Sequence, residues 1–595
     1  MFRDNKCWVL KRKKIGNVPR SSTHSHAVTQ PIAPINRVFM QAVIVAAAVL
    51  ITYIPAVRGG YIWDDDRYVT KNITLGDVAG LRRIWFDVGA TPQYYPLVFT
   101  SFWIERRIWD THPAGYHLTN VLLHAVNAVL VLVALRRLKI PGAWIAAMVF
   151  AVHPVHVESV AWITERKNVL SGTFYLGALL AYLRFSGIEK PDDHRPNRWR
   201  FYLLSLILFT AALLGKTVTC TLPAVIALIL WWKRQPFRWR TLLPLIPMVI
   251  IAGPASMLTA ALERHQVGAQ GPEWGFSILE RTLIAGRAVW FYVFSLLAPA
   301  NLTFIYPRWH IDVSQWWQYL FPVGVIVALA LLWVCRTRFG QGPLVACLFF
   351  VGTLMPALGF VNVYPMLFSF VADHFQYLAS IGLIALMAAA GTRVCARWTR
   401  SARTLLFATV LVGLMTITWG QESKYKDNES LWNDTIRRNP AAWIAHNNLS
   451  EPLLAHHDFV GAAEHALIAL RLHPKYASAH NNLGLALAGL GEADKAVKEF
   501  RQAIELNPAL PQARLNLAEQ LINQNDWEGA EREYIQAIKS APDLADAHYN
   551  YAVLLAMRRR PTEAIRECQT ACALNPDDPQ SQLLLRTLKQ DTENR

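Results

Sequence analysis

The chain has 595 residues, of which 53% are hydrophobic and 22 are tryptophan, and it carries a net charge of +17. It is too long for one ordinary domain, and repeated apolar runs of about 17 residues or more place roughly the first two-thirds in a membrane. The positive charge does not indicate nucleic-acid binding, because the basic residues lie in short loops between apolar runs, as the positive-inside rule requires. The seven cysteines are scattered, so we expect no disulfide framework.

The N-terminal residues 1–36 are polar, basic and interrupted by prolines, which predicts a disordered cytoplasmic tail. The first apolar run, about 38–57, has no small-residue cleavage site, so we interpret it as a signal anchor. The loop 58–116 that follows is rich in tryptophan and tyrosine. We expect it to form helices lying in the membrane interface.

Three adjacent carboxylates, Asp64, Asp65 and Asp66, lie at the start of this loop, directly after the first span. Their mutual repulsion beside low-dielectric lipid is expected to raise their pKa values. Such a group could act as a base or hold a metal ion. The alternative is a solvated loop with helix-capping aspartates.

Further apolar runs predict about eleven crossings in a membrane domain over residues 37–425. After the first span, the predicted spans are 118–135, 143–163, 169–185, 201–215, 217–232, 242–262, 317–335, 343–361, 375–391 and 404–420. Basic clusters at 136–139, 195–200 and 233–240 fall on alternate loops, which places those loops in the cytoplasm and the acidic loop outside.

The topology of segment 281–299 decides on which side of the membrane the later loops and the C-terminal domain lie. As a re-entrant or interfacial helix, it keeps the later basic loops inside and puts the C-terminal domain on the same outer face as the acids. As a span, it would move that domain to the cytoplasm. Its Arg281 and Arg287 favour the helix that does not cross.

From residue 438 the composition is that of a soluble domain, and the sequence becomes periodic. The period appears in Pro440, Pro474, Pro508, Pro542 and Pro576, and in two rows of alanines. A repeat of about 34 residues with helical spacing inside each unit is typical of tetratricopeptide repeats. The predicted fold is therefore all-α: a polytopic membrane domain followed by a tetratricopeptide-repeat α-solenoid of four units over 438–590, closed by a capping helix at 577–590.

Such a solenoid has a concave surface that binds other molecules. We expect Asn447, Asn481, Asn516 and Asn550 to line it and hold an acceptor polypeptide. Local hydrogen bonding on the helix surface is an equally acceptable role for these amides.

The segment 153–168, at the outer end of the third span, carries ionisable residues at membrane depth, where they are costly and usually functional. His153, His156 and Glu158 could ligate a metal, although their spacing is not a recognised zinc pattern. We favour a polar cavity lined by these three residues and facing the acids of the first loop.

Cations on the predicted outer face could bind a phosphate group. Arg166 and Lys167 are expected near the lipid headgroups, with interfacial snorkelling as the alternative. Lys216 lies between two apolar stretches. The span at 375 is preceded or opened by Asp373, His374 and Tyr377. We expect His374 to contact the phosphate when it is protonated, and Asp373 and Tyr377, with Asp66, to line the polar cavity.

Together these segments resemble the transmembrane-and-tetratricopeptide O-mannosyltransferase family and its bacterial relatives, of the GT-C class of glycosyltransferases. The matching stretches are Trp63-Asp64-Asp65, His153-Pro154-Val155-His156 with Glu158, Arg166, Lys216, and Ala372-Asp373-His374 with Tyr377. The resemblance implies that Asp64 or Asp65 is the catalytic base, with Asp66 leaving the choice open, and that Arg166 and Lys216 bind the donor phosphate. Lys167-Asn168 and His374 depart from the family, where Ala-Asp and an arginine are common.

The implied function is transfer of a sugar, mannose among the options, from a polyprenyl-phosphate donor to an acceptor hydroxyl on the outer face of a bacterial inner membrane. The acceptor would be a polypeptide held by the repeats. No cofactor is implied beyond the lipid-linked donor, and a divalent cation stays open. The alternatives are a non-catalytic scaffold for envelope assembly and a lipid-linked sugar transporter.

Overall fold

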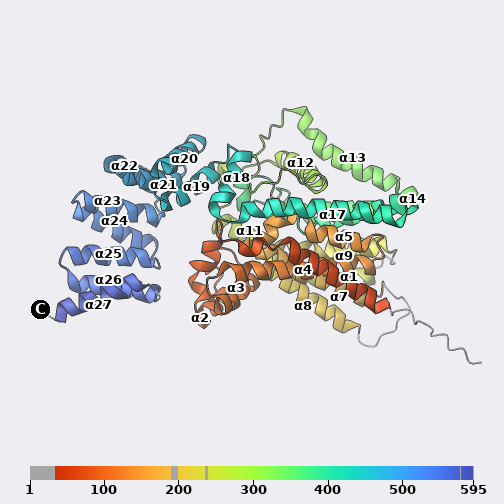
Figure 1. Ribbon diagram of the computed structural model, residues 1–595, viewed down its shortest axis with the longest axis horizontal. Coiled ribbons are helices and arrows are strands. Elements are labelled where there is room, and N and C mark those ends of the chain that lie inside the picture. The colour runs from red at the N-terminus through yellow and green to blue at the C-terminus, as the bar shows by residue number, and fades with distance from the viewer. Residues whose placement is uncertain (1–33, 189–197, 235–238, 577, 594–595) are drawn as a thin grey trace, which may run out of the picture.

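A computed structural model describes residues 34–188, 198–234, 239–576 and 578–593. Most of the expected tail at 1–36, and part of the basic cluster at 195–200, therefore lie outside the described residues. Within those residues the chain is helical and contains no strand, which confirms the all-α class. A long helix bundle is joined to a curved row of shorter helix pairs (Figure 1).

The bundle contains apolar helices that match every predicted span. Its helices are α1 (Pro34–Thr52), α2 (Val78–Phe86), α3 (Pro96–Trp109), α4 (Pro113–Arg137), α5 (Ala143–Val152), α6 (Val157–Ala161), α7 (Arg166–Ser186), α8 (Trp199–Gly215), α9 (Leu222–Trp232), α10 (Trp239–Leu242), α11 (Ile246–His265), α12 (Ile278–Leu297), α13 (Leu320–Val334), α14 (Arg336–Phe339), α15 (Gly342–Leu354), α16 (Ser380–Val394) and α17 (Arg400–Glu422). Among the described residues, six helical segments are long and apolar enough to cross a membrane, or seven if α5 and its bent continuation are one span. Four shorter apolar helices accompany them, so the count of about eleven crossings stays a prediction.

Polar residues enter the bundle at a break within one span and at the turn between two others. Helix α5 ends at His153, whose backbone is extended before Pro154, and the chain bends by 54° into α6. Helix α8 ends at Lys216, which is also extended, before Pro223 in the first turn of α9. Irregular backbone at membrane depth is tolerated where it is buried in protein or lines a cavity.

Helix α12, the segment with the ambiguous topology, begins and ends at the same end of the bundle. Near its start, Arg281 donates to Gly359 O (2.6 Å), which follows α15. Near its end, Leu296 O lies 3.1 Å from Nε2 of His153, which ends α5. This arrangement agrees with a helix that enters the bundle without crossing it.

The acidic loop and the repeats also share this end. Ala56 N donates to Glu422 at the end of α17 (3.2 Å), and Trp63 N donates to Asn428 Oδ1 (2.7 Å) at the start of α18 (Asn428–Arg438). Helix α18 then packs against the first repeat helix. The two regions therefore lie on one side of the bundle, while the identity of that side as the outer face stays a prediction.

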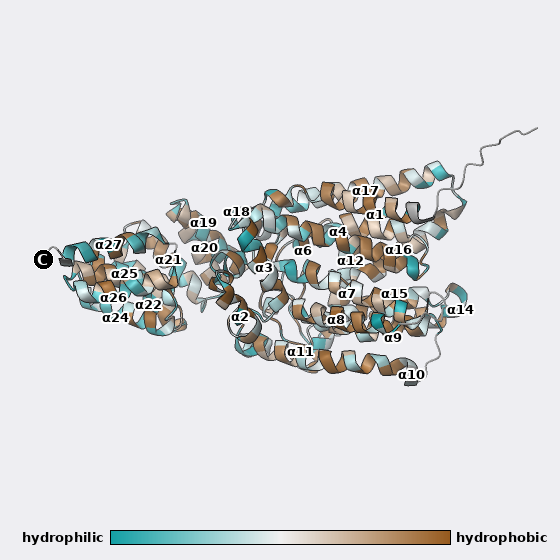
Figure 2. Cartoon of the chain, turned by 90° about the horizontal axis from the view of Figure 1, so that it is seen from below, coloured by the Kyte–Doolittle hydropathy of each residue, from teal (hydrophilic) through white to brown (hydrophobic). Residues whose placement is uncertain are grey.

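The C-terminal domain is a stack of four helix pairs with a final helix, as predicted. The helices are α19 (Trp443–Ala455), α20 (Phe459–Leu472), α21 (Ala477–Gly489), α22 (Ala493–Leu506), α23 (Pro511–Asn523), α24 (Trp527–Ser540), α25 (Ala545–Met557), α26 (Pro561–Leu574) and α27 (Pro579–Glu593). Both helices of each pair start one repeat period after their counterparts in the preceding pair. The periodic alanines are fully buried between them, and a Cβ at Gly484 would lie 2.6 Å from Phe500. Figure 2 shows hydrophobic residues along the bundle helices and a more mixed pattern on the solenoid.

Candidate active site

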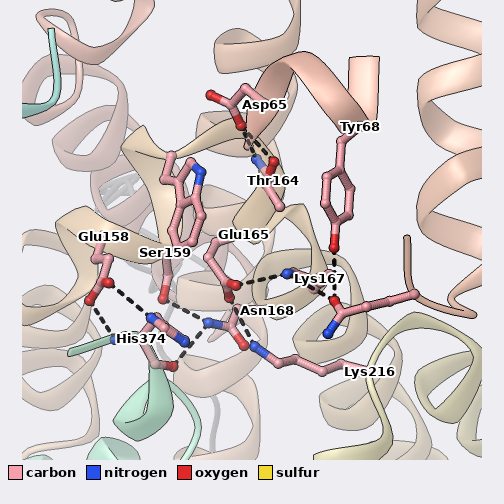
Figure 3. Close-up of polar contacts among 12 residues, drawn as sticks. Asp65, Tyr68, Glu158, Ser159, Thr164, Glu165, Lys167, Asn168, Lys216 and His374 are labelled. Carbon is pink, nitrogen blue, oxygen red and sulfur yellow. Dashed lines mark hydrogen bonds and ion pairs between the residues drawn. The ribbon is translucent and has the colours of Figure 1, made fainter. Parts of the chain in front are cut away.

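Asp65 fixes the acidic loop to the start of α7. The loop turns at Trp63, whose φ of +46° is unusual for a residue with a side chain. Oδ1 of the fully buried Asp65 accepts hydrogen bonds from Thr164 N (2.8 Å) and Thr164 Oγ1 (2.6 Å), and Oδ2 accepts one from Ile62 N (3.0 Å). Figure 3 shows the two contacts of Oδ1 with Thr164. Since Oδ2 is occupied as well, Asp65 has a structural role in this arrangement.

Asp64, by contrast, has a free oxygen. The residue is half-buried, yet its Oδ1 is buried and receives no hydrogen bond from any described residue. Buried oxygens are rarely left without a partner, so this atom is available to a ligand. Asp66 lies at the surface, where it accepts from Thr70 Oγ1 (2.9 Å) and pairs with Lys71 (3.4 Å).

Burial sets the protonation of the two inner acids. It raises the pKa of Asp64 to about 6, although the positive charge of Lys167 opposes this shift. Burial also raises the pKa of Asp65 to about 7, and the charge of Asp64 adds to the effect. The expected rise is therefore present, and desolvation contributes more to it than repulsion between the acids.

Two lysines share one carboxylate beside Asp64. Nζ of Lys167 lies 3.1 Å from Oε1 of Glu165, and Nζ of Lys216 lies 2.9 Å from Oε2 (Figure 3). All three side chains are buried, and Lys216 reaches the site from the break between α8 and α9. The two lysines outnumber Glu165, and Asp64, whose pKa the charge of Lys167 lowers, is the other acid beside them. Two neighbouring ammonium groups of this kind can bind an anion such as phosphate.

Gln93, from the loop before α3, orients Lys167. Its Oε1 accepts from Lys167 Nζ (3.3 Å) and from the hydroxyl of Tyr68 (2.9 Å). Its Nε2 donates to Glu263 at the end of α11 (2.7 Å). These bonds hold the lysine in place without neutralising it.

The expected phosphate contact at Arg166 is not available in this structure. Its side chain is fully buried, and its guanidinium donates to Glu105 (2.9 Å), Tyr116 O (2.8 Å), Ser101 (3.2 Å) and Asn120. Four of the five N–H donors of the guanidinium are thus in use inside the protein, and at most one is left for a ligand. We therefore assign Arg166 to the framework that joins α3, α4 and α7. Lys167, its neighbour, faces the acidic loop instead.

Glu158, Asp373 and His374 form a second polar group on the other side of Trp162. Oε1 of Glu158 lies 2.9 Å from Nδ1 of His374, and Oε2 accepts from His374 N (3.0 Å). Asp373 accepts a hydrogen bond from the hydroxyl of Tyr306 (3.0 Å). Asn168 donates to His374 O (2.9 Å) and so joins this group to the start of α7.

His153, His156 and Tyr377 do not line a cavity facing the acids, because each is buried in the helix core with a partner there. His153 contacts Leu296 O, and His156 contacts Phe150 O and Ser380 Oγ. The hydroxyl of Tyr377 contacts His124 and Asn127. In the described part of the chain, no group of three or more His, Cys, Asp or Glu side chains could hold a metal ion.

The asparagines of the repeats bond to one another along the stack. Asn516 donates to Asn481 (2.8 Å), Asn481 to Asn482 (3.3 Å), Asn482 to Asn447 (3.2 Å) and Asn447 to Asn448 (2.9 Å). Asn447 and Asn481 are buried, so they support this row of hydrogen bonds between neighbouring repeats. The row that keeps the repeat period is Asn448, Asn482, Asn516 and Asn550, and all but Asn482 are partly exposed.

Sequence reasoning missed three residues that organise the site: Glu165, Glu105 and Gln93. Glu165 stands within the segment 153–168, and a carboxylate at membrane depth was a usable signal. Glu105 and Gln93 lie in the first loop among many polar residues, and nothing in their local pattern distinguishes them.

The described residues thus form a helix bundle with apolar spans, followed by a tetratricopeptide solenoid, with a buried charged site at the end of the bundle that the repeats share. This is the architecture of a membrane protein with a C-terminal repeat domain. The tetratricopeptide repeat family model matches residues 451–511 and 515–579. The chain is similar to the protein O-mannosyl-transferase TMTC1 of Homo sapiens, with 26% identity over 73% of this chain and 55% of that protein. It is similar to a protein O-mannosyl-transferase of Caenorhabditis elegans, with 23% identity over 72% of this chain and 62% of that protein. These comparisons confirm the resemblance expected from the sequence.

Other matches are shorter. Protein O-mannosyl-transferase Tmtc1 of Drosophila melanogaster is 34% identical over 30% of this chain and 21% of that protein. The crystal structure of MamA matches 25% of this chain and 86% of its own, with 18% identity and a TM-score of 0.23. The alignments thus cover between about a fifth and three-fifths of the length of these O-mannosyl-transferases.

Proposed function

We propose that this protein is an integral-membrane glycosyltransferase of the GT-C type. It would move a sugar from a polyprenyl-phosphate donor to a hydroxyl group of a polypeptide. The observation that carries the proposal is the position of Asp64, whose Oδ1 is free, within the electrostatic influence of Lys167, which shares Glu165 with Lys216. The names of its relatives support the same reaction class.

In the proposed reaction, Asp64 is the base and Lys167 and Lys216 bind the donor phosphate. The acceptor oxygen forms a bond to the anomeric carbon of the sugar as the bond from that carbon to the phosphate oxygen breaks. Asp64 takes the proton of the acceptor hydroxyl. The electron pair of the broken bond leaves on the polyprenyl phosphate, whose growing negative charge the two lysines offset.

The repeats would hold the acceptor as an extended polypeptide. Amide side chains both donate and accept hydrogen bonds, and the partly exposed Asn448, Asn516 and Asn550 would meet it in register. The ring centre of Trp443 in the first repeat lies 5.3 Å from that of Phe368, which lies 6.0 Å from that of Trp63, directly before Asp64. The repeats therefore lead towards the proposed base.

The test is sugar transfer from a polyprenyl-phosphate mannose to a peptide by the purified full-length protein. Asp64→Asn is expected to lower kcat about 100- to 10,000-fold, the usual contribution of a general base, while the thermal unfolding midpoint is unchanged. Asp65→Asn is expected to lower the unfolding midpoint, because it replaces an acceptor of three hydrogen bonds. Full transfer by Asp64→Asn would contradict the assignment of the base, and no transfer by the wild type with any lipid-linked sugar would favour the scaffold alternative.

The proposed site is on the outer face of a bacterial inner membrane. Cysteine substitution at Asp66 and Asp494, in a background without the native cysteines, tests this with a reagent that does not cross membranes. We expect both positions to label from outside. Labelling of neither position would place the acids and the repeats in the cytoplasm.

A further inference from the structure

The Glu158–His374 pair has a free side that faces the proposed phosphate site. The carboxylate makes two contacts with one residue, Oε1 to Nδ1 (2.9 Å) and Oε2 to the backbone N–H (3.0 Å). Both side chains are buried, with 7% of the imidazole and 2% of the carboxylate side chain exposed. Trp162 packs edge-on against the imidazole, with ring centres 5.9 Å apart. The ring therefore has a fixed position.

Nε2, the other ring nitrogen, makes no hydrogen bond to a described residue, and 6% of His374 is exposed, more than of Glu158 or Glu165. Figure 3 shows the imidazole between Glu158 on one side and Asn168 on the other, with Glu165 and Lys216 beyond Asn168. An imidazole that donates Nδ1–H to a carboxylate presents, in its protonated form, one N–H donor on its opposite side. That donor points to the cluster in which two lysines share Glu165.

We propose that Glu158 is a positioning residue that holds His374 so that its Nε2–H binds the donor phosphate together with Lys216. This inference rests on the proposed function, because it assumes a lipid-phosphate donor. It assigns a role to Glu158 that does not involve a metal. It also explains how a histidine can serve at this position: the glutamate supplies the orientation that the guanidinium plane of an arginine has by itself.

The experiment measures binding of farnesyl phosphate to the purified full-length protein in detergent, with farnesol as the ligand that lacks the phosphate. No sugar transfer is needed. Glu158→Gln is expected to weaken farnesyl phosphate binding about 10-fold, as the loss of an orienting carboxylate does at other ligand sites. Farnesol binding is expected to be unchanged. Glu280→Gln, at the exposed start of α12, is the matched control and is expected to bind as the wild type does.

A double-mutant cycle separates orientation from folding. An arginine at position 374 presents several donors in a rigid plane and does not need Glu158 to orient a single N–H. In the His374→Arg background, adding Glu158→Gln is therefore expected to change binding less than about twofold. An equal loss in both backgrounds would mean that Glu158 acts on the fold and would overturn the inference.

The outcomes also separate this inference from the proposed function. If the wild type binds farnesyl phosphate no better than farnesol, the lipid-phosphate donor and the inference both fail. If the wild type prefers the phosphate and Glu158→Gln binds it equally well, the inference alone fails. If His374→Arg keeps phosphate binding and abolishes transfer, His374 is a base and the phosphate role is overturned.

Discussion

Two arginine–glutamate pairs of similar length occupy different environments in this protein. Arg166 and Glu105 lie 2.9 Å apart in the bundle, with 0% and 7% of their side chains exposed. Arg514 and Glu533 lie 2.7 Å apart in the third repeat, with 15% and 24% exposed. The first pair is enclosed by helices from three parts of the chain, whereas the second is open to water.

The pair in the repeats is one copy of a recurring contact. His480 and Glu499 (2.6 Å) stand at the same positions in the preceding repeat, and His548 and Glu567 (2.8 Å) stand there in the following one. In the first repeat, His465 replaces the glutamate and contacts His446 (2.9 Å). A contact that recurs in successive repeats is part of the solenoid architecture. When it is lost in one repeat, the copies in the other repeats remain and continue to stabilise the stack.

The bundle contains a further contrast between balanced and unbalanced charge. Arg166 and Glu105 neutralise each other, and the other arginine donors bind neutral oxygens. Glu165 has two lysines. Balanced buried charge holds helices together, whereas the second lysine depends on Asp64 or on a bound anion to balance its charge.

The largest effect is expected for Arg166→Met. It leaves Glu105 buried without its partner, which costs about 3–5 kcal/mol of stability. We expect a lower thermal unfolding midpoint in detergent, and partial recovery when Glu105→Leu is added, because the unpaired carboxylate is removed. A variant that keeps the wild-type midpoint but loses farnesyl phosphate binding would restore Arg166 to the phosphate site.

A smaller effect, on binding rather than on folding, is expected for Lys216→Met. Glu165 keeps Lys167 as its partner, so the unfolding midpoint should change little. Loss of a hydrogen bond to a charged phosphate costs about 1.5–3 kcal/mol, or roughly a 10- to 150-fold weaker affinity for farnesyl phosphate. Lys495→Met, on the exposed surface of the second repeat, is the control and should bind normally. Unchanged affinity in Lys216→Met would mean that Lys216 serves to pair with Glu165 and does not bind the phosphate.

Periodic features of the sequence predicted the fold well. Apolar runs located the apolar helices of the bundle, and the regular repeat step located each helix pair, because both patterns follow directly from burial. The sequence did not show that α5 bends at Pro154 by 54° and brings Glu158 to His374. That contact depends on the packing of segments that lie far apart in the chain.

The site was predicted in part. Lys167 and Lys216 both contact Glu165 beside the acidic loop, as expected for a shared site. The side chain of Arg166, one residue before Lys167, instead points into the contacts that join α3, α4 and α7. Successive residues of a helix point about 100° apart, so a small rotation of α7 decides which of them meets a ligand. The sequence does not specify that rotation. The same limit applies to the asparagines, where a shift of one residue separates the buried Asn447 from the partly exposed Asn448.

A shift in pH dependence is expected for Lys167→Met. Asp64 has a pKa of about 6 and must be deprotonated to act as a base, so kcat at saturating donor should fall as the pH drops through about 6. The positive charge of Lys167 lowers this pKa, and its removal should move the fall in kcat to higher pH by up to about one unit. Lys71→Met, beside the surface Asp66, should leave the profile in place. A shift to lower pH would contradict the assigned proximity of Lys167 and Asp64.

The smallest effect is expected for Arg514→Gln in the repeats. A partly exposed ion pair contributes about 0.2–1 kcal/mol, and the neighbouring repeats keep their own copies of the contact. Hydrogen exchange of the full-length protein should show slightly faster exchange in α23 and α24, with sugar transfer unchanged. Arg514→Gln and Arg166→Met remove the same chemical pair at nearly the same distance, so the difference between their costs measures burial. Equal costs would mean that the environment of the two pairs does not distinguish them, and the assignment of Arg166 to the framework would lose its physical basis.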